Sequence, residues 1–197
     1  MKLPSNKKII HLAKNVFDIE IGELKRVSSN LDDNFYQAIK LILECKGKVI
    51  VSGMGKSGLI GRKIAATLCS TGTLAIYMHP AEALHGDLGV VEDKDIIIIL
   101  GKSGESDEII TMLPVLKKIG CRIISITGNI NSTLAKHSHV VLNSFVEKEA
   151  CSLNLAPTSS TTAALVIGDA ISTVLSQLKN FKEEDFALFH PGEIGRA

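Results

Sequence analysis

The chain of 197 residues has little of what marks several classes of protein. It contains no tryptophan, and aromatic residues make up only 4% of it, so few rings are available for stacking on nucleic-acid bases. Its net charge is close to zero, at +1, without a basic cluster. These absences argue against a protein dedicated to binding nucleic acid, and they are compatible with a small anionic ligand.

Cysteine is also scarce. The four cysteines lie far apart, form no CxxC pair and have no secretory context, so they indicate neither a disulfide framework nor a zinc cluster. We expect reduced and mostly buried thiols at Cys45, Cys69, Cys121 and Cys151.

Long apolar segments are missing as well. No uninterrupted apolar run could span a bilayer, and residues Met1 to Lys8 lack the apolar stretch of a signal peptide. We therefore expect a cytoplasmic protein that binds no membrane. A chain of this length suits one domain, because folding then hides roughly 70% of the surface of the unfolded chain.

The apolar residues that are present predict an α/β fold. Two amphipathic helices are expected between residues 6 and 45, and short apolar runs then alternate with helical patterns. Runs such as Ile96 to Leu100 lack polar alternation, which is typical of parallel strands covered by helices on both faces. Strands are predicted at 49–52, 74–78, 95–100, 122–127 and 140–142, and a last long helix at about 159–178.

We predict a three-layer, doubly wound sheet of five mainly parallel strands in the flavodoxin-like order 2-1-3-4-5. Residues 1–197 would form a single domain, with the N-terminal helices 6–45 and a C-terminal helical tail 159–197 used in oligomerisation. In this order strands one and three are neighbours at the switch point, where a crevice opens. Each is followed by a Gly/Ser turn that opens a helix, Gly53 to Gly58 after the first and Gly101 to Ser106 after the third. Both turns should line the crevice.

The first turn contains both a GxGxxG spacing and a GKS triplet. A nucleotide-triphosphate loop requires GxxxxGK[ST], but Ile50 stands where its first glycine should be. A dinucleotide fold expects an acidic residue about twenty positions further on, whereas the second strand ends in Met78 and His79. Neither nucleotide is therefore favoured.

The second turn favours a phosphomonoester. Ser103 and Ser106 add hydroxyl groups to backbone N–H groups at a helix N-terminus, where the helix dipole attracts an anion. Either serine alone would more often be a helix cap. Two such turns beside one crevice make a ligand site the better interpretation.

Four segments of the chain are informative together: SGES (Ser103 to Ser106), HPAEALHGDLG (His79 to Gly89), EACSLNLAPTSSTTAAL (Glu149 to Leu165) and FHPGE (Phe189 to Glu193). They resemble the sugar isomerase (SIS) domain family, and more narrowly its D-arabinose 5-phosphate isomerases, which serve the Kdo branch of lipopolysaccharide or capsule synthesis. The resemblance implies interconversion of D-ribulose 5-phosphate and D-arabinose 5-phosphate without a cofactor. It also implies a homotetramer whose active sites are shared between subunits.

The same resemblance implies roles for individual residues. Catalytic roles fall to Lys56, His85, Glu108, Glu149 and His190. Substrate contacts fall to Ser57, Gly72, Thr73, His79, His85, Ser103, Glu105 and Ser106. His79 is also a candidate metal ligand that catalysis does not require.

The chain departs from the family pattern at several positions. Gly101 and Lys102 replace the usual Ser-Asn or Ser-Lys before SGES, Ser152 and Asn154 replace a proline and a glycine, and Glu193 replaces a glycine. Many relatives continue into paired CBS regulatory modules. We interpret this chain as a short form without them, either natural or trimmed.

The chemistry of an aldose-ketose isomerase suits these residues. A proton must move between C1 and C2 through an enediol, which requires a base and polarising donors but no redox group. Glu149 is the first choice for the carbon base, because burial in its apolar loop would raise its pKa, and Glu108 is the rival. Lys56 would neutralise the phosphate or an oxyanion, and His85 would assist proton transfer between oxygens.

Two alternatives remain open. SIS domains also serve as non-catalytic sensors of phosphosugars in regulators, although no DNA-binding partner domain is visible here. The chain could instead isomerise another sugar phosphate, as phosphoheptose or hexulose-phosphate isomerases do.

Overall fold

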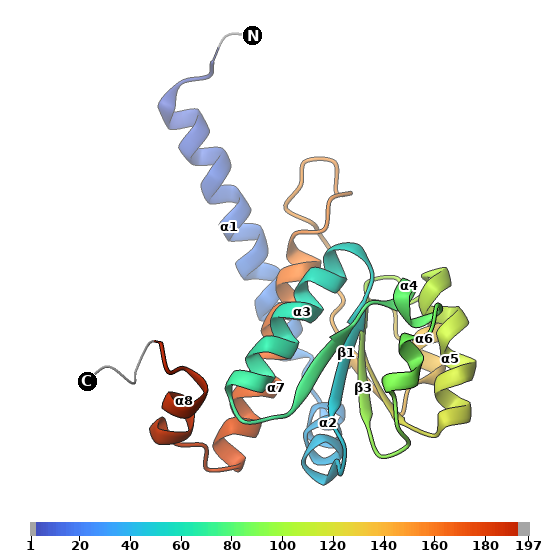
Figure 1. The fold of residues 1–197 in the computed structure, drawn as a ribbon. Helices are drawn as coiled ribbons and strands as arrows, with labels where there is room; N and C mark the ends of the chain where they lie inside the picture. The colour runs from blue at the N-terminus through green and yellow to red at the C-terminus, as the bar shows by residue number, and fades with distance from the viewer. Residues whose placement is uncertain (1–2, 193–197) are drawn as a thin grey trace.

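The computed structural model describes residues 3–192 and contains a five-stranded sheet between two layers of helices (Figure 1). All neighbouring strands run parallel, in the order β2-β1-β3-β4-β5. This confirms the predicted fold class and strand order. The strands are β1 (Val49–Gly53), β2 (Ala75–Met78), β3 (Ile96–Gly101), β4 (Arg122–Thr127) and β5 (Val140–Asn143).

The helices agree closely with the apolar periodicity of the sequence. They are α1 (Asn6–Ser29), α2 (Asp33–Glu44), α3 (Gly55–Ser70), α4 (Pro80–Ala83), α5 (Asp107–Ile119), α6 (Thr133–His137), α7 (Ser159–Leu178) and α8 (Glu183–Phe189), with a short 3-10 turn, η1, at Asp87–Val90. The C-terminal tail predicted over 159–197 is described as far as Gly192. Glu193 and the residues after it, like Met1 and Lys2, lie outside the described residues.

The central strand β3 explains why its sequence shows no polar alternation. Every residue from Ile96 to Gly101 is buried. Ile96 and Ile98 belong to the core beneath α1, α2, α3 and α7, whereas Ile97 and Ile99 belong to the core beneath α4, α5 and α6. Successive side chains of a strand point to opposite faces, so a sheet covered on both sides needs apolar residues at every position.

Helix α7 is part of the first core. Among residues 3–192 it is the one helix long and apolar enough, by length and composition, to cross a membrane. Its residues Ala163, Ile167, Ile171 and Leu175 are buried, and it packs against α3. A helix in the core of a globular protein can have the same length and apolar composition, so these two properties do not assign α7 to a membrane.

Helix α1 packs on the rest of the chain only near its C-terminal end. Val27 and Glu23 are buried there, whereas the N-terminal half projects from the domain (Figure 1). Apolar side chains on that half are exposed, including Leu12 at 55% and Phe17 at 69%. The apolar periodicity of this helix therefore predicted its secondary structure but not a buried face within one chain.

The cysteines are less buried than the sequence suggested. All four are free, but only Cys121 is buried, while Cys45 and Cys151 are half-buried and Cys69 is exposed. Cys69 lies in the last turn of α3, where its thiol donates to the carbonyl oxygen of Ala75 at 2.8 Å. The expectation of mostly buried thiols was therefore wrong.

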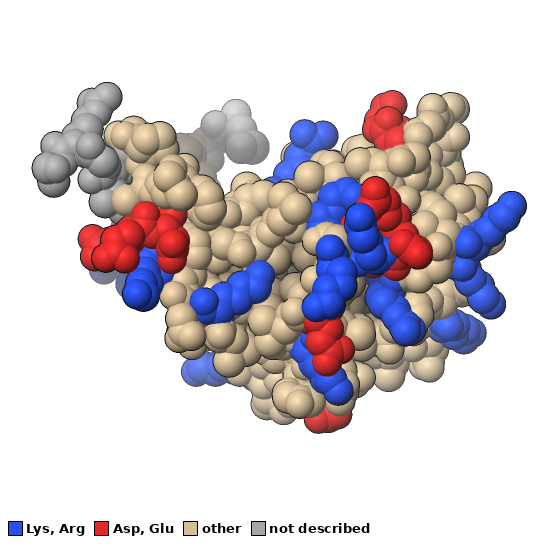
Figure 2. Space-filling view, turned by 60° about the horizontal axis from the view of Figure 1, so that its bottom comes forward, with Lys and Arg blue, Asp and Glu red and all other residues tan. Residues whose placement is uncertain are grey.

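The charged side chains are mixed in sign. On the face drawn in Figure 2, lysine and arginine side chains lie interspersed with aspartate and glutamate, beside a broad uncharged area. This agrees with the net charge of +1.

The contact between α3 and α7 predicts the effect of a small substitution. A Cβ at Gly168 of α7 would collide with the buried side chain of Ile64 of α3, whereas a Cβ at Gly22 of α1 would meet no atom. We expect Gly168→Ala to lower the free energy of unfolding by about 1–3 kcal/mol through overpacking. The matched Gly22→Ala should leave it unchanged or raise it by about 1 kcal/mol, because alanine favours a helix over glycine. Equal effects of the two variants in urea unfolding would contradict this account.

Candidate active site

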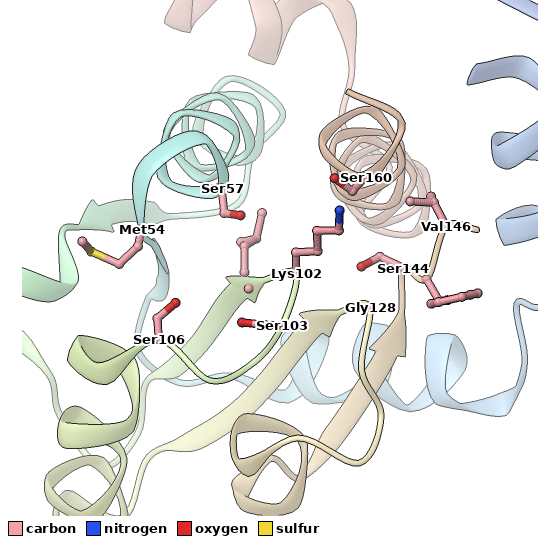
Figure 3. A pocket seen from close by; sticks show the side chains of 12 residues that line it. Met54, Ser57, Lys102, Ser103, Ser106, Gly128, Ser144, Val146 and Ser160 are labelled. Atoms are coloured by element: carbon pink, nitrogen blue, oxygen red, sulfur yellow. The ribbon is translucent and has the colours of Figure 1, made fainter. Parts of the chain in front are cut away.

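A cavity of about 420 Å³ lies at the carboxyl ends of the strands. The turn after β1 contributes Ser57, the turn after β3 contributes Ser103 and Ser106, and the start of α7 contributes Ser160. Figure 3 shows the hydroxyl groups of Ser57, Ser103 and Ser106 facing the same space. The two Gly/Ser turns therefore line one cavity, as the sequence predicted.

Close packing shapes the turn after β1. A Cβ at Gly58 would collide with the carbonyl oxygen of Gly53 and the hydroxyl of Tyr77, and Tyr77 donates to that carbonyl oxygen at 2.8 Å. Only glycine lets α3 begin this close to the strand. Lys56 lies in the first turn of α3, exposed and next to Ser57. Among these residues, Ser57 but not Lys56 lines the cavity.

Helix α6 braces the turn after β3. Gly104 has a φ of +69°, and a Cβ there would collide with the side chain of Ser132. The Glu105 carboxylate accepts a hydrogen bond from the backbone N–H of Thr133 at 2.7 Å, at the start of α6, and this bond lowers the pKa of Glu105. Glu105 thus fixes the conformation of the turn, and its carboxylate is engaged away from the cavity lining.

Glu149 is a buried carboxylate, with only 2% of its surface exposed. Its Oε1 accepts from Lys102 Nζ at 2.5 Å. Its Oε2 accepts from the backbone N–H and the hydroxyl of Thr158 at 2.8 and 3.1 Å, and from the backbone N–H of Ser160 at 3.2 Å. The carboxylate therefore occupies the N-terminus of α7, where the helix dipole favours negative charge.

The pKa of Glu149 differs from the sequence-based expectation. Burial raises it, as expected, but the bonds from Lys102, Thr158 and Ser160 outweigh burial and lower the pKa to about 2. The expected rise of the pKa was therefore wrong for this conformation. A solvated loop charge is equally excluded, because the carboxylate is buried.

One departure from the family pattern has a clear structural reason. Asn154 has a φ of +55°, a left-handed conformation that asparagine tolerates better than most residues and that glycine adopts freely. Its side-chain oxygen accepts from the backbone N–H of Glu149 at 2.7 Å. Asn154 thus replaces a glycine and also holds the segment that carries Glu149.

Lys102 is a cavity residue for which the sequence predicted no role. It lines the cavity and pairs with Glu149. Its position directly before SGES was the available signal. The pairing itself joins residues 47 positions apart, so local sequence could not reveal it.

The other predicted residues at this edge of the sheet lie beside the cavity or in a second hollow. Glu108 is the second residue of α5, half-buried and two positions after Ser106. His79 follows β2 and lines a separate hollow with Glu82 and Asp87.

The two histidines near this hollow differ in their contacts and exposure. His79 Nδ1 accepts from the backbone N–H of Ala81 at 3.2 Å and caps α4. His85 is exposed, shortly after the end of α4. Within residues 3–192, no three His, Cys, Asp or Glu side chains lie close enough together to hold a metal ion, around His79 or elsewhere.

The last three predicted residues lie at the opposite edge of the sheet. Gly72 and Thr73 precede β2, whereas the cavity residues follow β1 and β3, and all these strands are parallel. Gly72 and His190 line one hollow together. The Thr73 hydroxyl accepts from Lys179 Nζ at 2.7 Å, and the His190 ring stacks on Phe186 with centroids 3.7 Å apart. A single chain does not bring these residues to the cavity.

The low pKa of Glu149 predicts a pH-dependent stability. The unfolded glutamate has a pKa of about 4.3, and the folded-state pKa is about 2. The ionised carboxylate therefore stabilises the fold fully above the unfolded value, and this contribution is lost as the pH falls through the folded value. We expect Glu149→Gln to be less stable than the parent at neutral pH, and the difference to shrink below about pH 4.5.

Urea unfolding of both proteins between about pH 7 and pH 3 measures this difference. The exposed Glu44→Gln is the control and should differ little from the parent across the range. A Glu149→Gln difference that did not change with pH would contradict the low pKa.

Comparison with known proteins gives consistent matches. The family model of the SIS domain matches residues 42–174. The arabinose 5-phosphate isomerase KdsD of Francisella tularensis is 51% identical over 191 residues, covering 95% of this chain and 58% of the relative. The arabinose 5-phosphate isomerase KdsD of Pseudomonas aeruginosa is 47% identical over 197 residues, covering 100% of this chain and 60% of the relative. The chain thus spans about 60% of the length of these curated relatives.

A solved structure also matches along the whole fold. The structure of c3406 from E. coli CFT073, in complex with arabinose 5-phosphate, has a TM-score of 0.93 at 43% identity, covering 95% of this chain and 100% of that one. The match of the SIS family model includes both Gly/Ser turns, Glu108 and Glu149. The chain therefore belongs to the SIS domain family.

Proposed function

We propose that this protein is an aldose-ketose isomerase that interconverts D-ribulose 5-phosphate and D-arabinose 5-phosphate in the cytoplasm, and so supplies Kdo synthesis for lipopolysaccharide or capsule. The observation that carries the proposal is a cavity in which serine-rich turns lie beside a buried carboxylate and a lysine. The names of the arabinose 5-phosphate isomerase relatives support the substrate. The arabinose 5-phosphate bound in the similar solved structure supports it as well.

The phosphate would be held where the two turns meet. Ser103 and Ser106 precede α5, whose first backbone N–H groups face the direction of an incoming anion. Ser57 adds a hydroxyl from the opposite side of the cavity. The buried Ser160 hydroxyl has no hydrogen-bond partner within residues 3–192, which suits a polar group of the substrate. Holding the phosphate would orient C1 and C2 toward the catalytic groups.

Proton transfer then needs a base near C1 and C2. Glu149 and Glu108 are the two candidate carboxylates, with Glu149 the first choice because it is bonded to two residues that line the cavity, Lys102 and Ser160. The base takes the proton from one carbon and returns it to the other, through an enediol. Lys56 would stabilise the negative charge on the enediol oxygen, and His85 would move the proton between the two oxygens.

A second copy of the chain would complete the site. Gly72, Thr73 and His190 belong to the substrate site by family resemblance but lie at the far edge of the sheet in one chain. A homotetramer with shared active sites would bring them to the cavity of a neighbour. The exposed apolar side chains of α1 and of the hollow around His190 provide surface for such contacts, among them Phe17, Leu74 and Leu188.

The activity can be tested directly. We expect purified protein to convert D-ribulose 5-phosphate into D-arabinose 5-phosphate, followed by NMR of the sugar C1 signals. Formation of a different aldose would point to an isomerase of another specificity. Binding without turnover would favour a phosphosugar sensor, and absence of both would refute the proposal.

The two carboxylates should be needed for turnover. We expect Glu149→Gln and Glu108→Gln each to lower kcat by about 10²–10⁴-fold with smaller changes in binding, since this is the usual contribution of a positioned acid or base. Glu44→Gln, which is exposed and distant from the cavity, should keep full activity. Near-normal turnover of both the Glu149 and the Glu108 variant would remove the acid-base assignment.

Sharing of active sites predicts complementation between two inactive variants. Glu149→Gln and His190→Ala should each be inactive alone, but unfolding and refolding them together at equal amounts should restore roughly a quarter of the activity per site, from random pairing of subunits. The control mixes Glu149→Gln with Glu108→Gln. That mixture should stay inactive. Both carboxylates follow strands of the same chain, so every site in the mixture would lack one of the two. Equal recovery in both mixtures, or in neither, would refute shared sites.

A further inference from the structure

Lys102 stands between the proposed phosphate site and the proposed base. Its Nζ lies 2.5 Å from Glu149 Oε1, while 48% of its side chain is exposed. Ser103 follows it directly and lines the same cavity. Figure 3 shows the Lys102 side chain extending across this space toward Ser160. One ammonium group is thus near both the carboxylate and the place proposed for the phosphate.

The loop allows the side chain to move while its backbone stays in place. Gly101 ends β3 and is buried, and Gly104 is held against Ser132 of the neighbouring loop. Lysine carries a compact charge on a flexible four-carbon stem. Its ammonium group can therefore exchange one anionic partner for another without a change in the fold.

Glu149 keeps other partners when Lys102 leaves. Three donors on Thr158 and Ser160 bind its second oxygen, and two of them are backbone N–H groups at the start of α7. Loss of the lysine would remove one hydrogen bond and the one cation paired with this carboxylate among residues 3–192. The carboxylate would stay in place and become a stronger base.

We propose that Lys102 exchanges partners during binding: it pairs with Glu149 in the free protein and with the phosphate of the bound substrate. The inference rests on the proposed function, because it needs a phosphorylated ligand in this cavity. The exchange makes Lys102 a positioning residue that couples phosphate binding to the basicity of Glu149. The base is thereby restrained until a substrate with the right anionic group is held.

The other charged groups on the segments near Glu149 do not take the place of the Lys102 ammonium group. They are exposed or bonded to other partners: Lys148 is exposed, Glu147 pairs with Arg26, the Glu20 carboxylate accepts from the Thr162 hydroxyl, and the Glu23 carboxylate accepts from the backbone N–H of Glu147.

Carbon-13 NMR of the glutamate carboxyl groups tests the exchange in the full chain, with the Glu149 signal assigned by its loss in Glu149→Gln. The probe is D-arabitol 5-phosphate, which carries the phosphate but has no carbonyl group and cannot turn over. We expect its binding to raise the pKa of Glu149 by about one to three units, the usual effect of removing a nearby opposite charge. The Lys102→Met variant should show the raised pKa before the probe is added, little further change on binding, and about tenfold weaker binding or more.

Control variants and the binding of the probe distinguish a failure of the Lys102 exchange from a failure of the isomerase proposal. Lys148→Met removes an exposed lysine next to Glu149 in the sequence and should behave like the parent. Lys102→Arg keeps the charge and should retain most of the probe affinity. If the probe binds the parent protein and the Glu149 pKa does not move, Lys102 stays with the carboxylate and the exchange is refuted, while the isomerase proposal stands. If the probe does not bind, both are refuted.

Discussion

The parallel pairing of β1 with β3 is the constraint on which the site depends. Ser52 pairs with Ile99 and Gly53 with Leu100, so the two strands end side by side at the same edge of the sheet. From there α3 crosses to the face covered by α7, and α5 crosses to the other face. Two helices that start together and diverge leave a hollow between their N-termini. A Gly/Ser turn lies at the start of each helix, Gly53 to Gly58 at α3 and Gly101 to Ser106 before α5, so this hollow is also suited to an anion.

Burial of Glu149 sets a second condition on the site. A carboxylate with 2% exposure needs several hydrogen bonds to remain charged, and the start of α7 and Lys102 supply them. The same bonds make the group a poor base, because they stabilise its ionised form. A site built this way holds its carboxylate precisely in place but must weaken one of the bonds before that group can take a proton. Lys102 is the partner with an exposed and flexible side chain.

The two edges of the sheet divide the proposed functional residues. The serines and carboxylates lie at the carboxyl ends of the strands, whereas Gly72, Thr73 and His190 lie at the amino ends. Strand direction places Gly72 and Thr73, which precede β2, at the edge opposite the residues that follow β1 and β3, and His190 lies beside Gly72. The proposed assembly of several copies would let both groups act on one substrate, and the exposed apolar side chains of α1 suit such an assembly.

The sequence by itself determined the order of the strands and helices and the location of the two Gly/Ser turns that line the cavity. Those features depend on local patterns: unbroken apolar runs such as Ile96 to Leu100, helical periodicity, and glycines next to serines. Resemblance to the SIS family added the candidate functional residues, which local patterns could not distinguish from helix caps or surface charges.

The tertiary structure alone decided the partners and the charge state of the site. The pairing of Lys102 with Glu149 joins distant segments, and together with the bonds from Thr158 and Ser160 it outweighs the effect of burial on the pKa of that carboxylate. The engagement of Glu105 by α6 and the exposure of the apolar side chains of α1 likewise depend on how elements pack. Local sequence specifies where a side chain stands on its element, but electrostatics and burial depend on neighbours that only the folded chain brings together.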